Sequence, residues 1–457
     1  MKNKIIIGIT FLSVLLMSGC ASKQTTEINV LATTDLHGNL PYELTSYIKE
    51  ERERDKNITL VDAGDFFDSG PIGSPMEKYF DDRRTDIDNK TEKYIEAPIA
   101  KEMKEVGYDS VVLGNHEFVS NSKFYLDNMI SDFNKQDINV LSANTYNKDG
   151  SSYTKPYIIK NINTPKGNVK LGILGLTIKE VGENVDSNSL ELKDQGGYNG
   201  ELYMNDLVDD AKKWVDVMKK DKADVIVAVV HSGEKPKKPK NPGNRIQDLA
   251  QNVDGIDAIV AGHTHVQIKQ HDYKNNLGEQ VIVTQPGKHG ECVSKINFKL
   301  EKNNDKWNVV NKSSQLATLE KNQEMDKVSE FYGSLLSLDS KTKEISLGKV
   351  LPFKWDKLYV FEPYTPVETI YKTVGYKWRN IIPTDSEDMV QMVFMSNKKP
   401  ICYIYGDSNK TGLSLKIDKS EYKDSIITVL PNDNDNFKVQ KDEKTFKVNL
   451  EHIKKNI

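Results

Sequence analysis

The stretch Gly255-Ile256-Asp257-Ala258-Ile259-Val260-Ala261-Gly262-His263-Thr264-His265 places a short apolar run directly before a glycine and two histidines. The run from Ala258 to Ala261 does not alternate between polar and apolar residues, which predicts a strand that is covered on both faces. Gly262 lets the chain turn where the strand ends. Since His263 and His265 are two residues apart, an extended segment would point both to one side. The stretch therefore predicts a buried strand with two candidate ligands at its carboxyl end.

Four other apolar runs end in the same way. They are followed by Asp35-Leu36-His37, Gly64-Asp65, Gly114-Asn115-His116-Glu117 and His231-Ser232-Gly233, so that the whole set holds five of the eight histidines. Divalent metals of intermediate hardness accept aspartate oxygen, asparagine carbonyl oxygen and imidazole nitrogen together. One such motif alone is weak, but the ordered set predicts a pair of divalent metals, which is a means of breaking phosphate esters.

The remaining pattern alternates apolar runs with helix-like stretches. Strands are expected at 28–32, 58–61, 110–113, 138–142, 169–174, 225–230, 258–261 and 280–283, and helices at 42–54, 94–106 and 202–219. This order predicts an α/β layered domain, in which functional groups gather at the carboxyl ends of the strands. We expect this domain over 28–300, a polar linker with a helix over 301–346, and a smaller, reduced α+β domain over 347–457. Two charged segments, 81–88 and the basic, Pro-rich 235–240, are expected to be loops.

The first residues look like a targeting segment. Lys2 and Lys4 precede an apolar stretch that is too short to span a bilayer comfortably, and small residues stand just before Cys20. This resembles a bacterial lipoprotein signal, with residues 1–19 removed, Cys20 acylated and 20–27 serving as a tether. An ordinary secretory signal with an incidental cysteine is the alternative. We therefore expect an extracytoplasmic protein that is anchored to a bacterial membrane through its lipid only.

Charge and cysteine content narrow the class of protein further. The net charge is −4, and it would be −6 after removal of the two lysines of the targeting segment. Acidic and basic residues are interspersed, so no global field indicates nucleic-acid binding. Cys292 and Cys402 could pair in an oxidising exterior, but two cysteines make no disulfide framework, and we expect unpaired thiols.

With these motifs in this order, the sequence resembles the calcineurin-like metallophosphoesterases. More narrowly, it is similar to the secreted group of 5'-nucleotidases and 2',3'-cyclic-nucleotide 2'-phosphodiesterase/3'-nucleotidases. The resemblance covers roughly residues 28–300. It rests on Thr33-Thr34-Asp35-Leu36-His37-Gly38-Asn39, Leu60-Val61-Asp62-Ala63-Gly64-Asp65, Leu113-Gly114-Asn115-His116-Glu117-Phe118, the opening stretch at 255–265 and Gln285-Pro286-Gly287.

The resemblance implies a four-layered α/β/β/α domain with a dinuclear metal centre. One metal would be held by Asp35, His37 and His265, and the other by Asn115, His231 and His263, with Asp65 bridging both. A hydroxide shared by the two metals would attack phosphorus, and His116 would contact the phosphoryl group or protonate the leaving oxygen. Mn, Zn, Fe, Co and Mg all suit such ligands.

Two departures from the family pattern stand out. Members of the family often have Asp or Asn directly after the Asn-His-Glu-Phe run, where it orients the histidine, but this chain has Val119. In addition, the C-terminal segments that sandwich a base between aromatic rings are not recognisable. Phe361, Tyr364, Tyr403 and Tyr405 are candidates for stacking on a base, although core aromatics are the favoured interpretation. His271, His289 and His452 are expected to be solvated or structural.

The function expected from the sequence is hydrolysis of extracellular nucleotides, either 2',3'-cyclic phosphodiesters or terminal monophosphates. Two alternatives remain. One is a metallophosphoesterase that acts on a non-nucleotide phosphoester, as the missing nucleoside-pocket segments suggest. The other is a catalytically impaired binding lipoprotein, which Val119 would favour.

Overall fold

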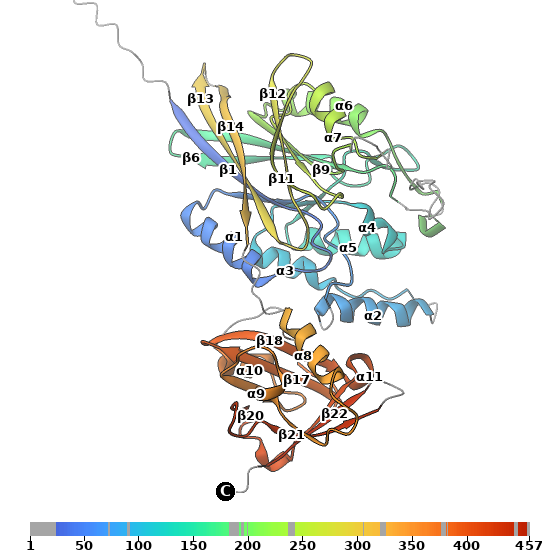
Figure 1. The fold of residues 1–457 in the computed structure, drawn as a ribbon. Helices are drawn as coiled ribbons and strands as arrows, with labels where there is room; N and C mark the ends of the chain where they lie inside the picture. Colours follow the sequence, from blue (N-terminus) through green and yellow to red (C-terminus); the bar gives the residue numbers. More distant parts are fainter. Residues whose placement is uncertain are drawn as a thin grey trace, which may run out of the picture.

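The computed structural model describes residues 24–71, 74–88, 92–181, 192, 196–198, 200–235, 243–304, 306–319, 326–375, 381, 383–442 and 447–454. The chain forms two lobes, the first ending near residue 319 and the second beginning with the helix at 326 (Figure 1). The expected signal segment, Cys20 and residues 236–240 of the basic loop lie outside the described residues.

Two six-stranded sheets form the centre of the first lobe. The first sheet has the order β14-β13-β1-β2-β3-β4, and its strands are β1 (Thr25–Thr33), β2 (Thr59–Asp62), β3 (Ser110–Val112), β4 (Asn139–Leu141), β13 (Cys292–Asn303) and β14 (Lys306–Thr318). The second has the order β11-β12-β10-β9-β7-β6, with β6 (Tyr157–Thr164), β7 (Gly167–Thr177), β9 (Val225–His231), β10 (Ala258–Ala261), β11 (Gln267–Lys274) and β12 (Gln280–Pro286). The strands that precede the candidate ligands run parallel to one another within each sheet, namely β1, β2 and β3 in the first and β9 and β10 in the second.

Helices cover the outer face of each sheet. Those against the first sheet include α1 (Tyr42–Arg54), α3 (Pro98–Val106) and α5 (Lys123–Lys135), and those against the second are α6 (Leu207–Lys220) and α7 (Ile246–Asn252). Between the sheets, Val30, Val61 and Val112 share one apolar core with Val227 and Val260. The lobe is therefore an α/β/β/α sandwich, as Figure 1 shows.

The apolar strands agree with the sequence expectation, whereas several polar segments do not. Residues 301–322 were expected to be a linker, but β14 occupies 306–318 and pairs with β13, burying Trp307 on one face. Residues 202–204 form strand β8 (Leu202–Met204), because Asp206 caps α6 and starts the helix only at Leu207. The expected helix at 94–106 begins at Pro98, where proline suits the first helical turn.

The expected charged loop at 81–88 is also helical. It belongs to α2 (Pro75–Asp88), which lies at the end of the first lobe that faces the second (Figure 1). Lys78 on this helix forms an ion pair with Asp385 of the second lobe, at 3.2 Å between Nζ and Oδ2. Helix α2 is thus one point of contact between the lobes.

The second lobe is built on two four-stranded sheets. One has the order β15-β21-β22-β19 and the other β18-β17-β16-β20. Their strands are β15 (Glu344–Ser346), β16 (Lys357–Phe361), β17 (Met389–Ser396), β18 (Lys399–Asp407), β19 (Leu413–Lys416), β20 (Ile426–Val429), β21 (Asn436–Lys441) and β22 (Val448–His452), with helices α8 (Asp326–Leu336), α9 (Leu347–Val350), α10 (Val367–Val374) and α11 (Ser408–Thr411). The lobe has its own apolar core, which Phe331, Phe394 and Phe437 help to fill.

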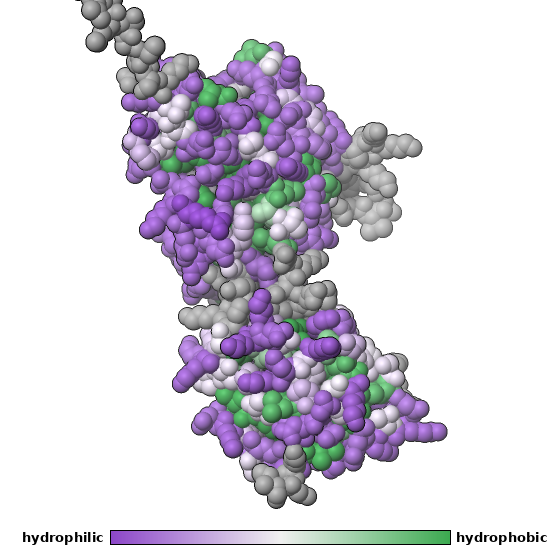
Figure 2. All heavy atoms as spheres, turned by 60° about the vertical axis from the view of Figure 1, so that its left-hand side comes forward, coloured by the Kyte–Doolittle hydropathy of each residue, from purple (hydrophilic) through white to green (hydrophobic). Residues whose placement is uncertain are grey.

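The surface is mainly hydrophilic on the face drawn in Figure 2, where apolar side chains form only small, separate patches. Among the described residues, no helix combines the length and the apolar character that crossing a membrane requires. Cys292 and Cys402 are both buried free thiols, as the sequence led us to expect.

Candidate metal centre

The strand ends of both sheets bring the seven predicted ligands together. Asp35 and His37 follow β1, Asp65 follows β2, Asn115 follows β3, His231 ends β9, and His263 and His265 follow β10. Five of these seven residues have left-handed backbone conformations, with φ of 52° at Asp35, 47° at His37, 56° at Asp65, 71° at His263 and 58° at His265. Such conformations are costly for residues other than glycine and are concentrated at functional sites. This backbone strain was not predicted from the sequence.

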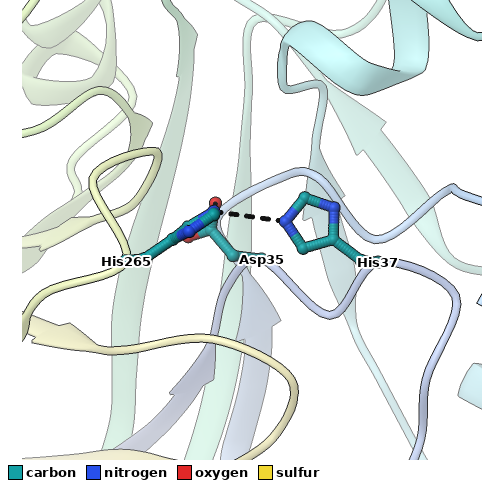
Figure 3. Close-up of side chains that lie close together, drawn as sticks. All are labelled: Asp35, His37 and His265. Atoms are coloured by element: carbon teal, nitrogen blue, oxygen red, sulfur yellow. Dashed lines mark hydrogen bonds and ion pairs between the residues drawn. The ribbon is translucent and has the colours of Figure 1, made fainter.

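One group of donors comprises Asp35, His37 and His265, whose ligand atoms lie within 4.8 Å of one another. The Nε2 atoms of His37 and His265 face each other at 3.2 Å beside the Asp35 carboxylate (Figure 3). Asp35 is fully buried and accepts hydrogen bonds from the Thr34 hydroxyl and the His263 amide. These contacts fix the direction in which the carboxylate points.

A second group comprises Asp65, His231 and His263, again with ligand atoms within 4.8 Å. The Oδ1 atom of Asn115 lies 3.0 Å from His231 Nε2 and 3.0 Å from His263 Nδ1, so it joins this group. His231 Nδ1 lies 2.8 Å from the carbonyl oxygen of Ala63, which can only accept. Nδ1 therefore donates to that oxygen, and Nε2 is the ring nitrogen that faces the site and could bind a metal once deprotonated.

Asp65 lies between the two groups. Its Oδ2 is 3.1 Å from His231 Nε2 and 4.0 Å from His116 Nε2, and it also forms a group with His37 and His116. Its Oδ1 accepts the backbone amide of His116 at 2.8 Å. Burial alone would raise the pKa of Asp65, but the adjacent His231 holds it below the usual range. The carboxylate is thus ionised and placed where it can serve two cations.

Glu117 supports the loop that carries Asp65. Its side chain is fully buried and accepts the backbone amides of Asp65 at 3.0 Å and Phe67 at 2.8 Å, as well as that of Gly114. Three backbone donors of two separate loops therefore depend on one carboxylate. Glu117 belongs to the motif that starts at Gly114, but no role was predicted for it from the sequence.

His116 lies at the start of the short helix α4 (Asn115–Val119), at the border of the centre. Its Nδ1 is 3.0 Å from Oδ2 of Asp68, and this hydrogen bond is the main cause that raises the pKa of His116 to about 9. The same Oδ2 lies 3.4 Å from His37 Nδ1. Sequence reasoning missed Asp68, although it stands only three residues after Asp65.

A cavity of about 570 Å³ opens beside these residues, within the usual range for small-molecule sites. Its walls include His37, Asp68, His116, His265 and His289. The His289 ring lies 5.2 Å from that of His37, so this exposed histidine, expected to be solvated or structural, faces the site. Its position two residues after the Gln285-Pro286-Gly287 motif was the available signal.

The aromatic residues proposed to contact a base do not line this cavity. Phe361 is 2% exposed and packs with Ile370 and Val393 in a core of the second lobe. Tyr364 is 55% exposed. Tyr403 and Tyr405 stack on each other with their ring centroids 5.8 Å apart. The described lining residues all come from the first lobe.

The donor set fits two divalent cations. Facing imidazole nitrogens, an amide oxygen between two imidazoles and a shared ionised carboxylate all direct lone pairs into the same space. Donors that surround one ion at about 2.1 Å lie at most about 4.2 Å apart, which is close to the spacing of each group. Such a centre is suited to polarising a phosphoryl group and activating water.

Comparisons with known proteins agree with this geometry. The family model described as calcineurin-like phosphoesterase matches residues 28–267. The trifunctional nucleotide phosphoesterase protein YfkN of Bacillus subtilis is 29% identical over 321 residues, which cover 64% of this chain and 21% of that protein. The 2',3'-cyclic-nucleotide 2'-phosphodiesterase/3'-nucleotidase of Yersinia enterocolitica is 26% identical over 345 residues, covering 67% of this chain and 48% of that protein. The matches therefore span from about a fifth to about a half of these relatives.

A solved structure gives the same picture. The crystal structure of the calcineurin-like phosphoesterase YfkN from Bacillus subtilis superimposes with a TM-score of 0.53 at 27% identity. The match covers 65% of this chain and 92% of that one. The similarity thus extends from the sequence to the fold.

Proposed function

We propose that this chain hydrolyses nucleotide phosphoesters, because it belongs to the calcineurin-like phosphoesterase family. As a member of that family it is a hydrolase of phosphoester bonds that uses a dinuclear divalent metal centre. The specific proposal is a 2',3'-cyclic nucleotide phosphodiesterase or a 3'- or 5'-nucleotidase. The observation that carries it is the convergence of the donors at one edge: Asp65 groups with His231 and His263 and also with His37, which in turn groups with Asp35 and His265. The substrate class is supported by the activities for which two of the relatives are named.

The chain's own residues would hold the metals in two sets. Asp35, His37 and His265 would bind one ion, and Asn115, His231 and His263 the other, with Asp65 shared by both. When bound, the two ions would supply Lewis acidity, which activates water and neutralises charge on the phosphoryl group. Asp35, Asp65 and His231 are each at most 2% exposed, so the two carboxylates would face the ions in a setting that excludes bulk water.

His116 would act on the leaving group. Its Nδ1 is held by Asp68, so its Nε2 faces Asp65 and the cavity. A substrate seated in that cavity would place the oxygen of its leaving group near Nε2, which would donate its proton as the ester bond breaks. General-acid catalysis of this kind typically contributes about 10²–10⁴-fold to the rate.

The first test is turnover by residues 21–457 of bis-p-nitrophenyl phosphate and of 2',3'-cyclic AMP, with and without added Mn²⁺. Asp65→Ala and His116→Ala would be measured beside the exposed control Asp216→Ala. We expect Mn²⁺-dependent hydrolysis of both substrates, lost in the two site variants and kept in the control. If metal binds and neither substrate is hydrolysed, the enzyme proposal is wrong and a binding lipoprotein remains.

A second candidate is hydrolysis of a non-nucleotide phosphoester. It is favoured by the burial of Phe361 and by a cavity lined from the first lobe. A sugar phosphate would need no aromatic sandwich, since its hydroxyl groups hydrogen-bond rather than stack. Hydrolysis of the aryl ester without hydrolysis of nucleotides would support this candidate.

We also propose that the chain is anchored outside the cytoplasm through lipid on Cys20. The support is the sequence of the first 20 residues, with its two lysines, its apolar stretch and the small residues before the cysteine. Growth with radiolabelled palmitate should label the wild-type chain and leave Cys20→Ser unlabelled. Label on Cys20→Ser, or none on the wild type, would contradict the anchor.

A further inference from the structure

We propose that Asp68 is the positioning residue of His116 and replaces the carboxylate that Val119 lacks. The inference rests on the proposed role of His116 in leaving-group protonation. Members of the family often carry an acidic or amide residue directly after the Asn-His-Glu-Phe run. In this chain the corresponding Val119 has no polar atom on its side chain and is 49% exposed. If His116 is oriented by a side chain, that side chain must therefore come from another residue.

The geometry at His116 provides that group from a different loop. Asp68 lies in the loop after β2, whereas His116 begins the helix after β3. The two residues are joined by a hydrogen bond of 3.0 Å between Nδ1 and Oδ2. A carboxylate in this position fixes the rotation of an imidazole ring, as carboxylates do behind histidines in metal sites.

Asp68 is itself held in place. Its second oxygen, Oδ1, accepts the backbone amide of Ser69 at 2.7 Å, which leaves Oδ2 directed at the imidazoles. The loop runs against the loop after β1, where Gly38 donates its amide to Phe66 O at 2.9 Å. A Cβ at Gly38 would lie 2.3 Å from the Asp68 carbonyl oxygen, so only glycine permits this close approach. The backbone that carries the carboxylate is therefore held in place before substrate arrives.

A competing role for Asp68 is support of His37, since Oδ2 also lies 3.4 Å from His37 Nδ1. That role would act through metal binding and would persist without His116. Action through His116 would vanish once His116 is removed. A double-mutant cycle on these two residues therefore separates the two roles.

The test compares the full chain with Asp68→Ala, His116→Ala and the double variant, at saturating Mn²⁺ and with metal content measured. Phenyl and p-nitrophenyl esters of phosphate would be the substrates, because phenolate is the poorer leaving group and needs a proton more. We expect Asp68→Ala to lower kcat for the phenyl ester about 10–100-fold, to lower it less for the p-nitrophenyl ester, and to leave metal content unchanged. The double variant should be no slower than His116→Ala.

Val119→Asp provides the rescue. Residues 116 and 119 are neighbours on one face of a helix, so an aspartate at 119 should restore part of the rate in the Asp68→Ala background. Asp216→Ala, at an exposed position on α6, is the matched control and should keep wild-type rates. The proposal would be overturned if Asp68→Ala lowered kcat equally for both esters. It would also be overturned if the double variant were slower than His116→Ala by the same factor by which Asp68→Ala is slower than the wild type.

One readout does not depend on turnover. In the Zn²⁺-loaded chain with ¹⁵N-labelled histidine, the Nδ1 shift of His116 reports its hydrogen bond and should change in Asp68→Ala but not in Asp216→Ala. An unchanged shift would overturn the positioning role even if the chain is active. A changed shift in a chain that hydrolyses neither ester would instead support the positioning contact and count against the proposed function.

Discussion

Replacing Glu117 by alanine tests whether one buried carboxylate holds two site loops together. The side chain accepts three backbone amides, those of Asp65, Phe67 and Gly114. A buried donor left without an acceptor costs about 1–3 kcal/mol. Three of them, with some entry of water into the space, should lower the free energy of unfolding by about 3–5 kcal/mol.

Glu117→Gln should be milder, for a reason that the geometry provides. Oε2 accepts two of the amides and Oε1 accepts the third, from Phe67. A glutamine can place its carbonyl oxygen at the Oε2 position and keep two of the three bonds. Its amino group would then face the Phe67 amide, so that about one donor is lost, at a cost of about 1–3 kcal/mol.

Differential scanning calorimetry would measure both variants beside Glu53→Ala, a control at an exposed position on α1. A loss of 3 kcal/mol corresponds to a fall in Tm of roughly 5 °C for a lobe of about 300 residues, at about 2.1 cal/mol/K of unfolding entropy per residue. The expected order of Tm is Glu53→Ala, then Glu117→Gln, then Glu117→Ala. A Tm for Glu117→Ala within about 2 °C of the control would refute the reasoning.

Three other predictions concern the bound metals, the glycine at 64 and the two buried thiols. Dialysis against a chelator should lower Tm, and adding Mn²⁺ should restore it, because an ion bound only by the native state stabilises that state; an unchanged Tm would count against a bound metal pair. Gly64→Ala should destabilise the fold by roughly 2–5 kcal/mol, since Gly64 has φ of 96° and a Cβ there would meet His231 Nδ1 at 2.6 Å. The control Gly278→Ala, with φ of 76° and nothing within 4 Å of the added Cβ, should lower the free energy of unfolding by only about 1–2 kcal/mol. Equal urea midpoints for the two variants would contradict the predicted clash between a Cβ at position 64 and His231. Finally, Cys292 and Cys402 should react with a thiol reagent in residues 24–457 only after denaturation, because both are buried; rapid labelling of the folded chain would show otherwise.

The apolar strands were predictable from sequence because both faces of each are covered. Val225–His231 is buried throughout, so its composition alone identifies it. Strand β14 has one side facing solvent, and its run of Asn, Lys and Ser conceals the buried Trp307. Helix α2 was missed for a similar reason, since its second half is dominated by charged residues. One-sided elements carry weaker signals than buried ones.

The ligand positions were predictable because each motif sits where a strand ends. The contacts behind them were not, because they join loops that are far apart in the chain. Asp68 meets His116 across 48 positions, and His289 reaches His37 from a loop at the opposite end of the lobe's sequence. Spacing patterns report neighbours along one segment, whereas these pairs depend on which strands lie side by side in the first sheet.

The seven donors come from both sheets of the sandwich, and this has a mechanical consequence. An ion held by residues of both sheets ties them together at one edge, as a covalent cross-link would, and closes a loop of some 230 residues between positions 35 and 265. Spreading that edge would require a coordination bond to break. Loading with metal should therefore slow amide hydrogen exchange at the ends of β1, β2, β9 and β10 in concert, and removal of metal should release all four ends together.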